Sequence, residues 1–190
     1  MLMMLSYTIT EYQQNRNKEW TLMVHQIREI GINDIDPFVK LLTTIYDESE
    51  YLIYNPGEYA PSNSDAVSNL EHYITSPSNA IYVAENNGEL VGFSIVTTEK
   101  FERTRHEANF SMGVIRHYRE KGLGQSLINS IEAWCLNHNI RRIEVSVVPE
   151  NETAVALFKA AGYQIDGELR DKLYIDGRYF NKYIMSKLLL

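Results

Sequence analysis

The segment from Val114 to Ser126, VIRHYREKGLGQS, carries the strongest chemical signal in the sequence. An apolar run ends there, a short polar loop follows, and Gly122 and Gly124 open a stretch with helical spacing. Glycines let an anionic ligand approach the backbone closely. The first N–H groups of a helix lack internal partners and carry the positive end of its dipole. The pattern predicts a phosphate- or pyrophosphate-binding turn. Two glycines alone would fit a plain turn with a solvated basic rim better than a binding site.

The local charge of this segment differs from that of the whole chain. The chain has 18 Lys and Arg against 25 Asp and Glu, a formal charge of −7. This segment instead has three basic residues, Arg116, Arg119 and Lys121, and one acidic residue, Glu120. An acidic chain is a poor partner for nucleic acid, whose binding depends on clustered basic residues, so we expect no nucleic-acid partner.

Two other phosphate motifs fit the segment poorly. A Walker loop needs a lysine after its second glycine, and Gln125-Ser126 does not supply one. A dinucleotide fingerprint needs Gly or Ala three residues beyond Gly124, where the sequence has Leu127. A nucleotide-phosphate binder is therefore the third and least favoured interpretation.

The elements that position this turn follow from hydrophobic periodicity. Helical spacing predicts helices from Asn33 or Asp34 through Ile45, from Ser64 or Asp65 through Tyr73, over 122–138 and from Asn151 through Ala161. Strands are expected at 24–30, 80–85, 90–98, 107–115, 142–148, 163–174 and 179–188, with hairpin turns at Asn87-Gly88 and Asp176-Gly177. This order predicts an α/β (α+β) fold with a mixed, mostly antiparallel central sheet flanked by helices.

Length and composition predict one domain. The 190 residues are 44% hydrophobic, enough for a substantial core. We expect an N-terminal extension over 1–23 and a single domain over 24–190. One cysteine, Cys135, excludes an internal disulfide and a multi-cysteine zinc site. No run approaches the roughly 18 apolar residues of a membrane helix. We therefore expect a cytoplasmic protein without a membrane partner.

Two motifs together resemble the GCN5-related N-acetyltransferases, the GNAT family. The first is Arg119-x-x-Gly122-x-Gly124 after a strand. The second runs from Asn151 through Ala154 and Leu157-Phe158 to Gly162-Tyr163. The resemblance covers about residues 24–188. The ending from Gly167-Glu168-Leu169-Arg170 to Met185 looks most like the ribosomal-protein and small-amine acetyltransferase branch.

The resemblance implies acetyl-CoA as co-substrate and no metal. Main-chain groups around Val114 would pair with the pantetheine arm, N–H groups from Arg119 to Gln125 would hold the pyrophosphate, and Asn151 and Lys159 would lie beside the cofactor. The full set expected at the cofactor is Met112, Val114, Ile115, Arg119, Glu120, Lys121, Gly122, Leu123, Gly124, Gln125, Ser126, Asn151, Phe158 and Lys159.

Amine acetylation also needs a base and a route for the leaving thiolate. Glu107, on the strand before the turn, is the first candidate base and His106 the second, although each is also typical of a solvated surface position. Many relatives place a tyrosine where this sequence has Phe158. A thiol has an ordinary pKa of about 8.5, so we expect the sulfur to leave with little or no general acid.

Residues 46–59 indicate the chemical class of the acceptor. Asp47, Glu48, Glu50 and Glu58 alternate there with Tyr46, Tyr51, Tyr54 and Tyr59, without Lys or Arg. Carboxylates and aromatic faces suit a cationic amine; a solvated acidic loop fits equally. We expect an N-acetyltransferase for a primary amine, either a small cationic amine or a protein N-terminus or lysine. The alternative is a non-catalytic acetyl-CoA sensor or regulatory module. The sequence leaves open whether the protein forms a homodimer.

Overall fold

The computed structural model describes residues 8–14, 20–59, 61 and 63–189. Within them, eight strands form one sheet in the order β1-β2-β3-β4-β5-β6-β8-β7. They are β1 (Thr8–Gln14), β2 (Trp20–Glu29), β3 (Asn79–Asn86), β4 (Glu89–Thr98), β5 (Glu107–Val114), β6 (Arg142–Val147), β7 (Gln164–Ile175) and β8 (Arg178–Leu188). Among the described strands, only β5 and β6 pair in parallel; the other neighbours are antiparallel. The expected mixed, mostly antiparallel sheet is confirmed.

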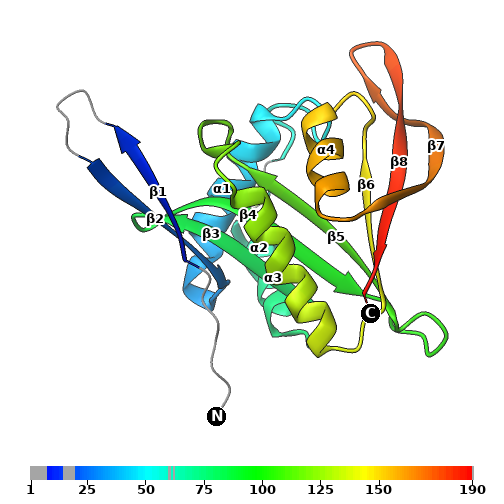
Figure 1. Cartoon of the computed structure of the whole chain (residues 1–190), viewed down its shortest axis with the longest axis horizontal. Helices are drawn as coiled ribbons and strands as arrows, with labels where there is room; N and C mark the ends of the chain where they lie inside the picture. The colour runs from blue at the N-terminus through cyan, green and yellow to red at the C-terminus, as the bar shows by residue number, and fades with distance from the viewer. Residues whose placement is uncertain (1–7, 15–19, 60, 62, 190) are drawn as a thin grey trace.

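Helices cover both faces of the sheet, as Figure 1 shows. They are α1 (Ile35–Glu48), α2 (Asn63–Thr75), α3 (Leu123–Asn137) and α4 (Glu152–Ala160), with short 3-10 turns η1 (Ile32–Asp34) and η2 (Arg116–Tyr118). Strand alternation sends successive side chains to opposite faces, so Ile81 packs under α1 with Phe38, whereas Ala80 packs under α3 with Ile128. The core is thus two apolar layers separated by the sheet.

Two tight turns follow the expected chemistry. Asn87 and Gly88 join β3 to β4 with φ of 51° and 85°, and Asp176 and Gly177 join β7 to β8 with φ of 48° and 79°. Two consecutive positive φ values are what a two-residue hairpin turn requires, so both predicted hairpins are confirmed.

The N-terminal part differs from expectation. β1 is an additional edge strand that pairs with β2 from Thr8 opposite Gln26 to Gln14 opposite Trp20. β2 begins at Trp20, so the expected domain boundary at residue 24 falls inside it. Residues 1–7 and 15–19 of the expected extension lie outside the described part. Among the described residues, no helix combines the length and apolar character needed to cross a membrane.

The feature that positions the site is a gap in the sheet. β5 and β6 pair only from Glu107 opposite Arg142 to Asn109 opposite Glu144. Beyond that point they separate, and Figure 1 shows the wider end of the gap beside α4. The separation leaves the facing edges of two strands without a partner in the middle of the molecule.

Candidate functional site

Strand geometry identifies which main-chain groups face this gap. Arg142 N–H donates to the carbonyl of His106, and Ile115 N–H donates to the carbonyl of Val91 in β4. Because main-chain groups alternate between the two edges of a strand, even-numbered residues of β5 point toward β6. Met112 and Val114 therefore direct their N–H groups into the gap, beyond the last β5–β6 pair. Such an edge offers donors and acceptors to an extended ligand, as in β-strand addition.

Two contacts reduce the number of main-chain groups that this edge offers to a ligand. The Val114 carbonyl already accepts a hydrogen bond of 2.9 Å from Nε of Arg119. The N–H of Ile115 faces β4 rather than the gap. The main chain thus presents Met112 and the N–H of Val114 for new hydrogen bonds, while the main-chain N–H of Ile115, expected at the cofactor, is committed to the sheet.

The turn after β5 has the backbone of an anion cradle. Glu120 and Gly122 adopt positive φ values of 61° and 79°, and Gly122 is the N-cap of α3. Within the described chain, none of the main-chain N–H groups from Glu120 to Gln125 donates a hydrogen bond to another protein group. Six unpaired donors at a helix N-terminus form a site for a phosphate or pyrophosphate.

The run of unpaired amides starts one residue later than expected from the sequence, and it ends at Gln125 as expected. Arg119 N–H donates to the carbonyl of Arg116, and Ser126 N–H donates to the carbonyl of Gly122 at 3.1 Å. The first closes η2, and the second is the first main-chain bond at the start of α3. Neither amide is available to a ligand in this conformation.

Glu48 ties this turn to the end of α1. Its Oε2 accepts a hydrogen bond of 2.6 Å from the N–H of Arg116, and its carbonyl accepts one of 2.9 Å from Nη2 of the same arginine. Nη2 of Arg119 lies 3.9 Å from Oε2 of Glu48. The carboxylate that the sequence suggested for an amine is therefore engaged by the basic turn.

α4 approaches the start of α3 beside the gap. A Cβ on Gly124 would lie 2.8 Å from Cδ2 of Leu157, so only glycine fits here without movement of that side chain. Asn151 caps α4, with its Oδ1 accepting from Ala154 N–H. Lys159 is exposed in the last turn of this helix.

Phe158 lies in the apolar core. It is 4% exposed and meets the rings of Phe110 and Tyr163 at centroid distances of 5.8 and 5.9 Å. Burial is also the main reason why the pKa of the Tyr163 hydroxyl is raised far above its ordinary value. Phe158 thus contributes packing here, and it carries no proton to donate.

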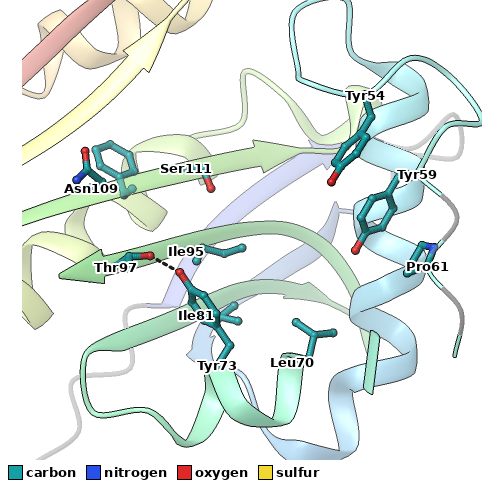
Figure 2. A pocket seen from close by; sticks show the side chains of 11 residues that line it. Tyr54, Tyr59, Pro61, Leu70, Tyr73, Ile81, Ile95, Thr97, Asn109 and Ser111 are labelled. Atoms are coloured by element: carbon teal, nitrogen blue, oxygen red, sulfur yellow. Dashed lines mark hydrogen bonds between the residues drawn. The ribbon is translucent and has the colours of Figure 1, made fainter. Parts of the chain in front are cut away.

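A cavity of about 590 Å³ lies on the opposite face of the sheet, toward α1 and α2. Figure 2 shows Tyr54 and Tyr59 pointing into it from the segment after α1, with Leu70 and Tyr73 from α2 below. The floor is the sheet itself. The lining residues are Tyr54, Tyr59, Pro61, Leu70, Tyr73, Ile81, Ile95, Thr97, Asn109, Phe110 and Ser111. Its β5 residues are those at which β5 and β6 begin to separate, so the cavity reaches the gap.

The polar groups of the described lining residues are neutral. Tyr73 and Thr97 share a hydrogen bond between their hydroxyl groups. Burial, together with the neighbouring Tyr54, raises the pKa of Tyr59, and burial raises the pKa of the adjacent Tyr46 to about 12. These two phenols stay protonated near neutral pH.

Glu107 and His106 lie at the paired end of β5. Nε2 of His106 is 3.6 Å from Oε1 of Glu107, and Glu107 is opposite Arg142 in the ladder. Glu107 shares the face of Asn109 and Ser111 but is not among the residues that line the cavity. The structure therefore does not bring either candidate base to the cavity.

The comparisons agree with this architecture. An acetyltransferase (GNAT) domain model matches residues 27–184. The L-amino acid N-acetyltransferase AaaT of Escherichia coli is 26% identical over 107 residues, which cover 56% of this chain and 66% of that protein. Spermidine N(1)-acetyltransferase of the same bacterium is 25% identical over 112 residues, 58% of this chain and 59% of the relative. The chain thus spans less than two thirds of each relative's length.

Solved structures share the fold over most of the chain. A GNAT-family acetyltransferase from Streptococcus pneumoniae superposes with a TM-score of 0.81 at 24% identity, covering 87% of this chain and 99% of its own. The yncA protein of Salmonella typhimurium, solved with its cofactor acetyl-CoA, gives 0.74 at 16% identity, covering 87% and 94%. With the family model matching more than half of its residues, the chain belongs to the GNAT acetyltransferase family.

Proposed function

We propose that the protein transfers the acetyl group of acetyl-CoA to a primary amine. The observation that carries this proposal is one continuous path. The unpaired amides from Glu120 to Gln125 lead to the free edge of β5, and that edge meets the cavity at Phe110 and Ser111. The acetyltransferase relatives support the same activity.

The residues present fit acetyl-CoA. Its pyrophosphate matches the cradle, where N–H groups to a charged oxygen form strong hydrogen bonds. Its pantetheine amides match the C=O of Met112 and the N–H of Val114. Asn151 caps α4, the helix beside this path, and the basic residues Arg116, Arg119 and Lys121 belong to the segment that leads into the cradle.

Bound acetyl-CoA would supply an acetyl group: a C–N bond forms, the C–S bond breaks, and CoA leaves as a thiolate. The Met112 N–H points into the gap and can stabilise the negative charge that develops on the carbonyl oxygen. The cavity supplies Asn109 and Ser111 as hydrogen-bonding groups for the incoming nitrogen. We assign the proton of the amine to water, because the described cavity lining contains no carboxylate or imidazole.

A thiol-release assay with a panel of amines tests the proposal. Acetyl-CoA and the protein should release CoA only when a suitable amine is present, and mass spectrometry should find that amine heavier by one acetyl group. An acetyl-CoA sensor would instead gain thermal stability with CoA and acetylate none of the amines, which would refute the proposal.

A further inference from the structure

We propose that the acceptor is a primary amine attached to an apolar, aromatic body and carrying no second positive charge. This inference rests on the proposed acetyltransferase function and names its substrate class. It narrows the small cationic amine that the acidic segment 46–59 suggests to one with a single positive charge.

The walls of the cavity are built for an apolar body. Ile81 and Ile95 form its floor, Leu70 lies to one side, and the rings of Tyr54 and Tyr59 close it from the loop after α1. These two rings are 5.1 Å apart and tilted at 54°, and each lies 4.8 Å from the ring of Tyr46, so aromatic packing fixes the ring surfaces that close the cavity. A volume of about 590 Å³ lies in the usual range for a small organic ligand.

The acidic side chains of the neighbouring segment do not line this space. Oδ1 of Asp47 accepts from the N–H of Gly57 at 2.8 Å. Glu58 accepts from the N–H and side chain of Asn55, and Glu48 accepts from Arg116. Glu50 is exposed and is not among the lining residues. Their negative charge can attract an ammonium group to the entrance, but it does not neutralise one inside.

Because the acidic side chains lie outside the cavity, the cavity distinguishes amines by their number of positive charges. An amine that reacts must give up its proton, so a single ammonium group enters and loses its charge. A second ammonium further along the ligand would remain charged against Ile81 and Leu70. Burial of an ion without a partner is strongly unfavourable. Tyr59 offers such an ion a ring face and a neutral phenol, but no formal negative charge to pair with it.

The orientation of the acceptor in the cavity follows from the position of the gap between β5 and β6. The nitrogen must lie beside Asn109 and Ser111, where β5 loses its partner, so that it can reach a thioester held along the β5 edge. The body of the ligand then extends over Ile95 toward Tyr54 and Tyr59.

The experiment compares 2-phenylethylamine with spermidine and 1,4-diaminobutane as acceptors at saturating acetyl-CoA. We expect kcat/KM for 2-phenylethylamine to exceed that for either polyamine at least tenfold. The variant I95E places a carboxylate in the cavity floor and should lower this ratio at least tenfold. The variant L70E, at a half-buried lining position on α2, should shift the ratio in the same direction if I95E fails to fold.

The matched control is I53E, which adds the same charge at a side chain that is 63% exposed outside the cavity. It should leave the ratio within twofold of wild type. A wild-type enzyme that prefers spermidine or 1,4-diaminobutane overturns the inference while the acetyltransferase function stands. If no amine is acetylated, the proposed function fails. Calorimetric binding of 2-phenylethylamine in the presence of CoA then decides the cavity's ligand class, and absence of binding overturns it.

Discussion

Replacing Gly122 with alanine perturbs the pyrophosphate cradle through its backbone alone. Gly122 holds φ at 79° and caps α3, a left-handed conformation in which a Cβ is strained by roughly 1–2 kcal/mol. In a domain of this length, 1 kcal/mol corresponds to about 2–4 °C in Tm. G122A should therefore unfold about 2–8 °C below wild type.

The effect on the cofactor should be larger than the effect on folding. Relaxation of the strain rotates the neighbouring N–H groups away from the pyrophosphate. A hydrogen bond to a charged group contributes about 1.5–3 kcal/mol, so loss of one such bond predicts a Kd for CoA about 10- to 100-fold higher. Pantetheine, which lacks the pyrophosphate, should lose little affinity.

Gly88 offers a matched control. It has φ of 85°, and a Cβ there would meet nothing within 4 Å, in the turn between β3 and β4. G88A should show a comparable loss of Tm with an unchanged Kd for CoA. Isothermal titration calorimetry of both variants with CoA and with pantetheine supplies the measurement. If a folded G122A bound CoA as tightly as G88A does, the anion cradle would be refuted.

Three further predictions follow from other parts of the structure. With 2-phenylethylamine, log(kcat/KM) should rise with unit slope up to the pKa of the amine, because the described cavity lining holds no carboxylate or imidazole; a plateau near pH 7 would reveal a base in the protein. F158Y should change kcat less than tenfold, since its ring packs against Phe110 and Tyr163; a gain of several orders of magnitude would contradict departure of the sulfur without a general acid. Hydrogen bonds from Arg28 lower the pKa of Asp34 below 3.8, so this contribution to stability is present above that pH and is lost as pH falls through the folded value. D34N should lower the free energy of unfolding by about 1–2 kcal/mol at pH 7. Chemical denaturation should show that the difference in this free energy between D34N and wild type shrinks below pH 3.8. A difference that does not depend on pH would contradict the assigned role of Asp34.

Local sequence signals were sufficient for most elements. The spacing of Ile35, Phe38, Leu42 and Ile45 predicts α1 because an apolar stripe must face the core, and all four side chains are buried. Asn87-Gly88 predicts its hairpin because few residue pairs accept two positive φ values. β1 was not predicted, because it is an edge strand defined by its pairing with β2 rather than by clear alternation of its own residues.

The site needed long-range information. The sequence could indicate a glycine turn with free amides. It could not indicate that β5 and β6 separate after Asn109 and Glu144, because the point at which two strands stop pairing depends on the whole fold. Glu48 and Arg116 are 68 positions apart, so their contact leaves no trace in local spacing. The alternation of acids and tyrosines in 46–59 was informative about the tyrosines, because Tyr54 and Tyr59 line the cavity. Asp47 and Glu58 satisfy local backbone donors instead.

A crystal structure of the protein with acetyl-CoA tests the central assignment most directly. We predict pyrophosphate oxygens within hydrogen-bond distance of main-chain nitrogens between Glu120 and Gln125. The pantetheine arm should lie along β5 at Met112 and Val114, with the acetyl group at the cavity end beside Phe110 and Ser111. Cofactor bound elsewhere, with the turn amides hydrogen-bonded to protein carbonyls, would contradict the account.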